Sequence, residues 1–183
     1  METKIFMGGI GGQGVVMGGK MLAGAAVSAG LFATCYNEYA PAMRNGFTYS
    51  NIMVSHEEVG AQVTASFDCM VFFDEASCKL KSSFLKKEGG LYIINSTLVQ
   101  SKPANASAKV YTMEVNKMAD ELGNVRLVNV LVLGGLVELL QIFDLKYMEN
   151  VLKESFGSNQ KVIDLNVKAL HAGAACIKEQ KGK

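Results

Sequence analysis

The sequence contains no tryptophan, two prolines and two histidines, and each scarcity narrows what the chain can do. Of its 18 basic residues only Arg44 and Arg126 are arginines, and the formal net charge is +1. This balance lacks the basic face with which nucleic-acid-binding domains attract phosphate backbones, so we expect no nucleic acid among the partners. His56 and His171 lie far apart in the chain, and we interpret both as surface or packing residues.

The four cysteines, Cys35, Cys69, Cys78 and Cys176, form no C-x-x-C pair. Iron–sulfur clusters need thiolates at close spacing, so we expect no metal or cluster to be held by this chain alone. A chain of this length and apolar content does not depend on disulfide bonds for stability. We therefore predict four reduced and mostly buried thiols.

Long apolar runs are also missing. The most apolar stretch, residues 128–143, is interrupted by three polar residues and falls short of the ~20 residues that a membrane span requires. Residues 1–4 lead directly into a short apolar segment and not into a signal-peptide core. We expect a cytoplasmic protein with no membrane partner, in which this stretch forms a buried helix.

What remains is the composition of a folded domain. The chain has 183 residues, 49% of them hydrophobic and 19% charged. Such a chain buries enough apolar surface to offset its conformational entropy. The length suits one domain, and we expect residues 1–183 to form a single unit.

Hydrophobic periodicity predicts strands that alternate with helices and a C-terminal third that is wholly helical. The expected strands are 4–10, 31–38, 48–55, 69–73, 91–94 and 110–113, and the expected helices are 14–29, 75–84, 115–122, 126–143, 146–156 and 164–178. This order indicates the α/β class with a central sheet. Only a short loop joins the second and third strands, so we expect them to pair antiparallel in a mixed sheet.

A glycine-rich loop, Gly8 to Gly14, follows the first strand and opens the first helix. Unpaired amides at a helix N-terminus suit a phosphate or another anion. Gly9, Gly11 and Gly14 fit the G-x-G-x-x-G pattern, and Glu38 near the end of the second strand is placed to accept a hydrogen bond from a ribose hydroxyl. An NAD-binding Rossmann domain is therefore one hypothesis, and a tight turn without a ligand is another.

A second loop, residues 39–48, contains Arg44, whose planar guanidinium suits carboxylate or phosphate. Parallel strands end at the same edge of a sheet, so this loop is expected beside the glycine loop, where the two would form an anion cradle. The alternative is that Arg44 pairs with a surface carboxylate. Gln13, at the tip of the glycine loop, is expected to contact a ligand or a partner.

The first helix contains three interior glycines, Gly18, Gly19 and Gly24. Each costs about 1 kcal/mol relative to alanine, so we expect close backbone packing to compensate. The sequence shows no Ser/His/Asp set, no paired carboxylates on a shared motif and no P-loop lysine. From its residues alone, the chain binds something but has no catalytic apparatus of its own.

Three segments together resemble the gamma subunit of the 2-oxoacid:ferredoxin oxidoreductases. They are Gly9–Val16 with the following Lys20–Ala23, Tyr39–Gly46 with Ser50, and Asn129–Gly134, and Asn166, Ala169 and Gly173 are similar to the family's closing helix. Ala40, Ala42 and Asn45 depart from the family's usual Gly, Glu and Gly. These departures leave the particular 2-oxoacid and the coenzyme A contacts open.

The resemblance implies a three-layer α/β/α Rossmann-like domain with a mixed sheet and a helical C-terminal third. It implies a complex that converts a 2-oxoacid to acyl-CoA and CO2 and passes electrons to ferredoxin. The alpha, beta and ferredoxin-like subunits would hold thiamine diphosphate, magnesium and the iron–sulfur clusters, and this chain would aid assembly and coenzyme A access. The residues expected at the cofactor are Gly11, Gly12, Gln13, Gly14, Arg44, Asn45, Gly46 and Asn129. No catalytic residue is expected here; the alternatives are an independent NAD-binding oxidoreductase and a purely structural module.

Overall fold

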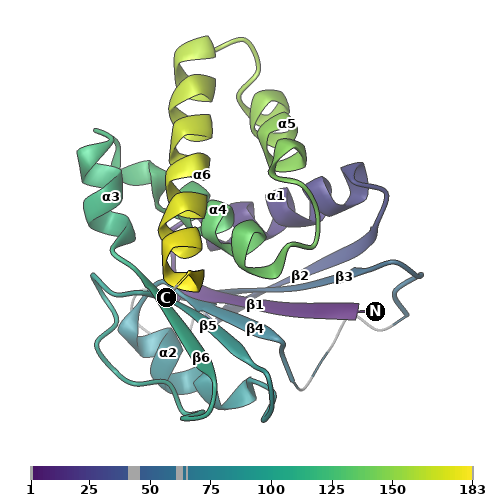
Figure 1. Cartoon of the computed structure of the whole chain (residues 1–183), viewed down its shortest axis with the longest axis vertical. Coiled ribbons are helices and arrows are strands. Elements are labelled where there is room, and N and C mark those ends of the chain that lie inside the picture. The colour runs from purple at the N-terminus through teal and green to yellow at the C-terminus, as the bar shows by residue number, and fades with distance from the viewer. Residues whose placement is uncertain (1, 41–45, 61–63, 65, 183) are drawn as a thin grey trace.

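A computed structural model describes residues 2–40, 46–60, 64 and 66–182, which form a sheet between two helical layers (Figure 1). The strands are β1 (Glu2–Ile10), β2 (Phe32–Ala40), β3 (Phe47–Ser55), β4 (Cys69–Phe72), β5 (Leu91–Asn95) and β6 (Lys109–Met113). The α-helices are α1 (Val15–Ser28), α2 (Glu75–Lys81), α3 (Val115–Glu121), α4 (Val128–Leu140), α5 (Leu145–Phe156) and α6 (Gln160–Lys181). Short 3₁₀ turns follow α2 (Ser82–Phe84) and precede α4 (Val125–Leu127).

The sheet is mixed, as the sequence predicts. Its strand order is β2-β3-β1-β4-β5-β6. β3 runs antiparallel to both β2 and β1, whereas β1, β4, β5 and β6 are parallel to one another. Because β3 is reversed between them, β1 and β2 end at the same edge of the sheet, so the loops that follow them leave from that edge.

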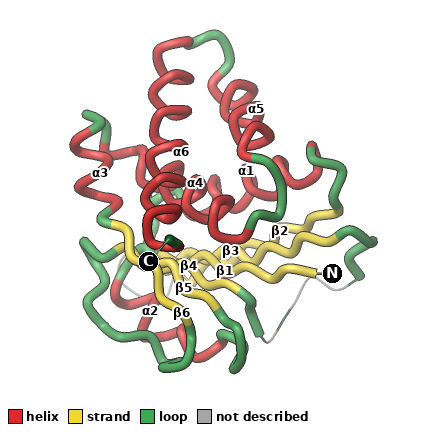
Figure 2. The backbone as a smooth tube through the Cα atoms, in the orientation of Figure 1, coloured by secondary structure: helices red, strands yellow, loops and turns green. Residues whose placement is uncertain are grey.

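The two layers are unequal, and together with the sheet they give the expected α/β/α arrangement. Figure 2 shows α1 and α3 to α6 on one face of the sheet, while α2 and several loops lie on the other. Side chains alternate along β1 accordingly: Ile5 and Met7 join the core beneath α1 and α4, and Phe6 joins an aromatic cluster with Phe72 and Tyr92 on the opposite face.

The apolar stretch predicted to be a buried helix is α4, and its residues from Val128 to Val137 are all buried. It crosses α6 at two glycines. A Cβ atom on Gly134 would overlap the carbonyl oxygen of Leu170, and one on Gly173 would overlap that of Leu131. The two helix backbones are therefore in direct contact, which requires glycine at both positions.

Two of the three interior glycines of α1 have the expected packing reason. A Cβ on Gly18 would lie 3.1 Å from the Met7 side chain, and one on Gly19 would lie 2.7 Å from the Ser50 Cβ. Gly24 differs, because its nearest neighbour would be an ordinary van der Waals contact with Val151 at 3.9 Å. The two glycines of α1 that close packing requires thus lie in the first half of the helix.

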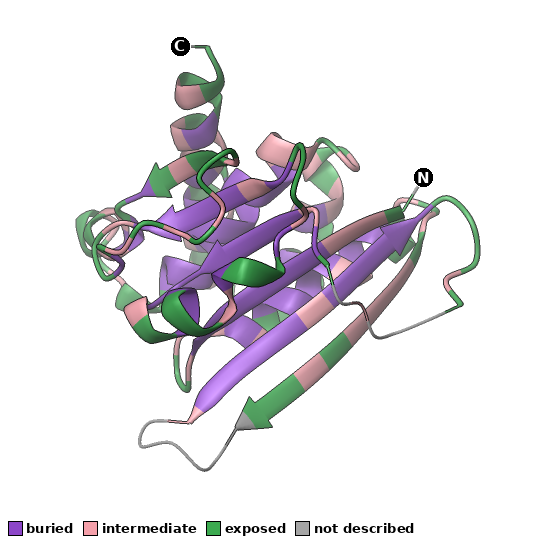
Figure 3. Cartoon of the chain, turned by 90° about the horizontal axis from the view of Figure 1, so that it is seen from below, coloured by how far each residue is buried: buried purple, intermediate pink, exposed green. Residues whose placement is uncertain are grey.

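Figure 3 shows that burial is deepest in the middle strands, while the edge strand β2 carries a run of exposed and half-buried residues. The described part of the chain contains no helix with the length and apolarity to cross a membrane. Several predicted helix ends differ: α2 stops at Lys81, α4 spans Val128–Leu140 and α6 spans Gln160–Lys181. α4 stops at Leu140, where Gln141 has a φ of 50°. The earlier start of α6 follows from Asn159, whose side chain accepts from the Val162 amide.

Candidate functional site

The glycine loop and the β2–β3 connection meet at the edge of the sheet, as predicted. The Gly11 amide donates to the Gly46 carbonyl oxygen at 3.2 Å, directly beyond the last β1–β3 pair, Ile10 and Phe47. Gly46, expected at the site, is therefore beside the loop. Arg44 and Asn45 lie outside the described residues, so their predicted roles remain predictions.

The loop leaves the amide end of α1 open. Gly12 and Gly14 have φ angles of 93° and 77°, the left-handed region that favours glycine. Gly14 is the N-cap and forms no side-chain cap, and nothing lies within 4 Å of a Cβ built on Gly11 or Gly12. The first amides of a helix have no intrahelical partner, so this geometry presents free N–H donors to a ligand or to another chain.

The Gln13 side chain forms hydrogen bonds within the chain. Its Oε1 accepts from the Ile10 amide at 2.9 Å, and its Nε2 donates to the Phe73 carbonyl oxygen at 3.4 Å. Both ends of the side-chain amide are used to hold the loop in shape. The side chain turns toward the loop because the bend leaves the Ile10 amide to be paired, and the predicted contact of Gln13 with a ligand or a partner stays a prediction.

Asn129 comes to the loop from the start of α4. Its side chain is 6% exposed, and its Oδ1 accepts from the Val130 amide at 3.0 Å. The Nδ2 end lies beside Gly14, where a Cβ would be 2.8 Å away from it. Asn129 thus contacts Gly14 and lines one cavity with Gly12 and Gly14, and the predicted contact of these residues with a cofactor stays a prediction.

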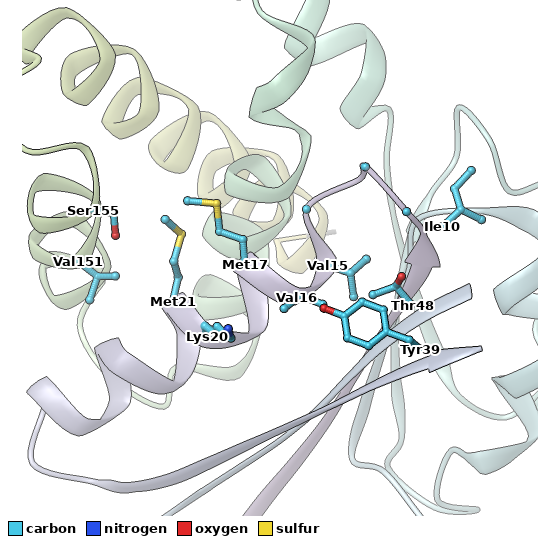
Figure 4. A pocket seen from close by; sticks show the side chains of 13 residues that line it. Ile10, Val15, Val16, Met17, Lys20, Met21, Tyr39, Thr48, Val151 and Ser155 are labelled. Atoms are coloured by element: carbon cyan, nitrogen blue, oxygen red, sulfur yellow. The ribbon is translucent and has the colours of Figure 1, made fainter. Parts of the chain in front are cut away.

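A largely apolar cavity of about 650 Å³ opens beside the loop, and we call it the apolar cavity (Figure 4). It is lined by Ile10, Gly11, Gly12, Gly14, Val15, Val16, Met17, Lys20, Met21, Tyr39, Thr48, Val151 and Ser155. Met17 and Met21 extend from α1 toward the side on which α5 carries Val151 and Ser155. Lys20 is the one charged residue among the described lining residues.

A second cavity, of about 470 Å³, shares Gly12, Gly14 and Met17 with the first. Its polar side chains are the amides of Gln13, Asn116, Asn124, Asn129 and Asn166 and the guanidinium of Arg126. We call it the amide cavity. Sequence reasoning missed Asn116, Asn124 and the two α5 residues of the apolar cavity, because no motif marks residues that meet only when helices cross.

Glu38 does not occupy the position that a dinucleotide site needs. Tyr39 lines the apolar cavity, so Glu38, the preceding residue of β2, points to the opposite face of the sheet. There its Oε1 accepts from the Asn51 Nδ2 at 2.8 Å. β3 also separates β2 from β1. The predicted ribose contact is therefore wrong, and the NAD hypothesis loses its acidic residue.

Ser50, which the sequence marks without giving it a role, ties the sheet to the start of α1. Its Oγ donates to Asn37 Oδ1 at 2.6 Å and lies 3.2 Å from the Val15 carbonyl oxygen. The neighbouring Cys35 thiol is half-buried, and burial raises its pKa despite the hydrogen bond to Asn37. This thiol is therefore protonated near neutral pH and has little nucleophilic character.

The remaining thiols are also unsuited to chemistry. All four cysteines are free, and Cys69 and Cys78 are buried. Burial raises the pKa of Cys69 and that of Cys176, and it raises the pKa of Cys78 to about 11. Within the described ranges, no group of three or more His, Cys, Asp or Glu side chains is arranged to hold a metal ion. The site can bind and orient a ligand, and its described residues include no activated nucleophile.

Comparison with known proteins gives consistent matches. A family model described as pyruvate ferredoxin/flavodoxin oxidoreductase matches residues 4–176. The chain is 31% identical over 176 residues to ketoisovalerate oxidoreductase subunit VorA of Methanothermobacter marburgensis, covering 94% of this chain and 36% of that protein. It is 28% identical over 185 residues to 2-oxoglutarate synthase subunit KorC of Methanocaldococcus jannaschii, covering 98% of this chain and 96% of that protein. The chain thus spans little more than a third of the ketoisovalerate subunit.

Two solved structures share the fold. One is the gamma subunit of a keto/oxoacid ferredoxin oxidoreductase from Geobacter sulfurreducens, with a TM-score of 0.83, 24% identity, and coverage of 97% of this chain and 99% of that one. The other is the 2-oxoglutarate:ferredoxin oxidoreductase from Magnetococcus marinus with 2-oxoglutarate, coenzyme A and succinyl-CoA bound. Its TM-score is 0.88 at 23% identity, with coverage of 97% of this chain and 31% of that one.

Proposed function

The chain belongs to the pyruvate ferredoxin/flavodoxin oxidoreductase family, and from that premise we propose that it serves as the gamma-type subunit of a 2-oxoacid:ferredoxin oxidoreductase. The complex would cleave the bond between the carboxylate and the oxo carbon, release CO2, and transfer the acyl group to the sulfur of coenzyme A. The pair of electrons set free would pass to ferredoxin. The chain itself would aid assembly and contact coenzyme A.

The observation that supports a coenzyme A contact most directly is the pairing of an open amide row with an apolar cavity. The free amides at the start of α1 and the Lys20 ammonium are suited to phosphate oxygens. The apolar wall formed by Met17, Met21 and Val151 is suited to the pantetheine arm. Among proteins of this fold, the Magnetococcus marinus oxidoreductase has coenzyme A bound.

The thiols and acidic side chains of this chain bear on which subunits would hold the cofactors of the complex. The described thiols are separated and protonated, and the described acidic side chains form no group that could enclose a metal ion. In the proposed complex, the alpha, beta and ferredoxin-like subunits would hold thiamine diphosphate, magnesium and the iron–sulfur clusters. This chain would position coenzyme A and exclude water from it.

An anaerobic purification of the tagged chain from its native cells, followed by mass spectrometry, tests the subunit role. Recovery of thiamine-diphosphate-binding and ferredoxin-like subunits is the expected result. A chain that emerges alone, under conditions that preserve complexes, would contradict it and would make calorimetric titration with NAD the next experiment.

The coenzyme A contact has its own test in the purified complex. Lys20→Gln should raise the KM for coenzyme A by about tenfold with kcat unchanged, as expected for loss of one charge-assisted contact. The matched control is Lys168→Gln, which removes the same charge from an exposed position of α6 outside both cavities. Equal kinetics in the two variants would remove Lys20 from the proposed site.

A second candidate is a purely structural module whose glycine loop contacts only a partner subunit. It is favoured by the empty space beyond Gly11 and Gly12, where no described residue covers the loop. Hydrogen exchange of the amides of residues 8–16 separates the two candidates. Protection that appears on assembly and does not change with coenzyme A supports the structural module, whereas added protection by coenzyme A supports the ligand contact.

A further inference from the structure

β2 borders the sheet, and the outer side of its backbone has no strand partner in the described chain (Figure 3). The Gly11 amide bonds to the Gly46 carbonyl oxygen, so even-numbered residues of β3 bond to β1 and odd-numbered ones to β2. The β2–β3 register pairs those odd residues with even residues of β2. The outward-pointing amides and carbonyls are those of Ala33, Cys35, Asn37 and Tyr39.

The opposite edge of the sheet is partly closed by a side chain. The Gln180 side chain on α6 accepts from the Thr112 amide at 3.1 Å and donates to the Thr112 carbonyl oxygen at 2.8 Å, as a neighbouring strand would. β6 is also short, with five residues against nine in β2. Long, uncovered edges are where further strands add to a sheet, so β2 is the edge suited to accept one.

The sequence of β2 lacks the residues that normally protect an edge. It contains no lysine, arginine or proline, and its one charged residue, Glu38, accepts from Asn51 Nδ2 at 2.8 Å. Three aromatic side chains of the strand are exposed: Phe32 by 49%, Tyr36 by 44% and Tyr39 by 67%. An unprotected edge that carries exposed aromatic residues indicates a partner strand.

The outward groups are complementary to those of a second copy of β2. A twofold axis at Tyr36, the middle residue of the strand, pairs two antiparallel copies along their whole length. Cys35 is then opposite the partner's Asn37, and Ala33 is opposite the partner's Tyr39. All four are outward-pointing residues, so each pair exchanges two backbone hydrogen bonds. The two Tyr36 side chains form the non-hydrogen-bonded pair at the axis, where cross-strand side chains lie closest.

Charge selects this register over its neighbour. With the axis at Tyr36, Glu38 is opposite the partner's Thr34, whose hydroxyl can donate to the carboxylate. An axis two residues further along would place the two Glu38 carboxylates opposite each other, which is destabilising, and would shorten the paired segment. Among symmetric pairings, the one about Tyr36 therefore combines the most backbone bonds with no like-charge pair.

We propose that β2 pairs with β2 of a second copy of this chain, antiparallel about Tyr36, so that the two sheets become continuous. Each copy uses the same strand, so the interface is closed at two copies. One strand from each copy makes a small interface, and the isolated chain should therefore associate reversibly with increasing concentration. The proposal does not rest on the oxidoreductase role, because it needs only this chain.

Disulfide trapping in the isolated full-length chain tests the register. In Tyr36→Cys the two new thiols are directly opposite, with Cα atoms about 4.5 Å apart, which a disulfide can span. The matched control is Glu38→Cys, an exposed position on the same face whose symmetry mate is roughly 14 Å away along the strands. Both variants carry Cys35→Ser, which removes the native thiol of β2. On non-reducing gels after mild oxidation, Tyr36→Cys should form covalent dimer about tenfold faster than Glu38→Cys.

Sedimentation velocity over a concentration series measures the association without a cross-link. Tyr36→Lys places two ammonium groups opposite each other and should raise the dimer dissociation constant by about tenfold. The matched control is Val110→Lys, which adds the same charge at an exposed position of β6 and should leave the constant unchanged. Because both positions are exposed, neither substitution should prevent folding.

Three results would overturn the proposal. They are a native chain that sediments as a monomer at every concentration, equal cross-linking of Tyr36→Cys and Glu38→Cys, and an unchanged dissociation constant in Tyr36→Lys. The last would place the contact between copies elsewhere on the surface. Because both readouts need no other subunit and no turnover, a failure here is distinguishable from a failure of the subunit role.

Discussion

Asn129 lies against the backbone of Gly14, so that a Cβ atom on Gly14 would be 2.8 Å from the Asn129 Nδ2. This contact joins the N-cap of α1 to the first turn of α4 and fixes the glycine loop relative to the helical layer. Two of the segments that resemble the family, Gly9–Val16 and Asn129–Gly134, are distant in the sequence and meet in the fold through this contact. A larger side chain at either position would therefore displace the other residue.

The contact predicts unequal costs for two alanine substitutions. Gly14 and Gly30 have similar positive φ angles, 77° and 82°, but nothing lies within 4 Å of a Cβ on Gly30. Gly30→Ala should cost about 1 kcal/mol of unfolding free energy from backbone strain alone. Gly14→Ala adds the collision with Asn129 and should cost about 3 kcal/mol. Urea denaturation of both variants measures the difference, and equal losses would contradict the contact.

The crossing of α4 and α6 predicts an opposite pair of effects. Gly173→Ala forces a methyl group into the Leu131 carbonyl and should destabilise the fold by about 3 kcal/mol. The methyl group of Gly24→Ala, on α1, meets only Val151 at 3.9 Å and should stabilise the chain by about 1 kcal/mol. Thermal unfolding followed by circular dichroism distinguishes them, and a stabilised Gly173→Ala variant would show that the helices are further apart.

The Glu75 carboxylate provides a pH-dependent link between α2 and the loop that precedes β6. The Ser101 hydroxyl, the Lys79 ammonium and the amides of Gln100 and Ser101 lower the pKa of Glu75 to about 2. Because the folded-state pKa is lowered, the link contributes stability at pH values above the ordinary pKa of a glutamate and loses it as the pH falls toward 2. An NMR pH titration of Ser101→Ala should show a higher Glu75 pKa, and an unchanged midpoint would exclude the hydroxyl as the main cause.

The thiols should differ in their reaction with iodoacetamide. Cys69 and Cys78 are buried and their pKa values are raised, so neither should be alkylated in the native chain at mildly alkaline pH. Cys35 and Cys176 are half-buried and should react slowly. In denaturant all four should react alike. Peptide mapping after a timed reaction gives the four rates, and rapid native labelling of Cys69 would contradict its position in the core.

Much of the fold is predictable because it depends on periodicity. Alternating strands and helices, the mixed sheet and the buried α4 all follow from apolar spacing and loop length, and the three motifs identify the family that the family match confirms. The meeting of the glycine loop with Gly46 was also predictable, because it follows from strand direction alone.

The side chains of the site are less predictable, because their directions depend on packing. Gln13 turns inward because the loop leaves the Ile10 amide unpaired, a fact visible only once the loop is folded. Glu38 fits a sequence spacing, but β3 enters the sheet between β2 and β1 and the strand pleat directs Glu38 to the wrong face. The Asn129 and Asn166 side chains share a cavity only because α4 and α6 cross in contact.

That crossing has a mechanical consequence. Where helices are separated by a layer of side chains, rotamer changes let one helix slide against the other. Gly134 and Gly173 remove that layer, so the backbones of α4 and α6 are in direct contact where the helices cross. We expect the two helices to move as one rigid unit. α6 extends well beyond the sheet in Figure 1, and α4 begins at Val128 with Asn129 in its first turn. We therefore expect a displacement of the projecting end of α6 to move α4 with it, and to move Asn129 against Gly14 of the glycine loop.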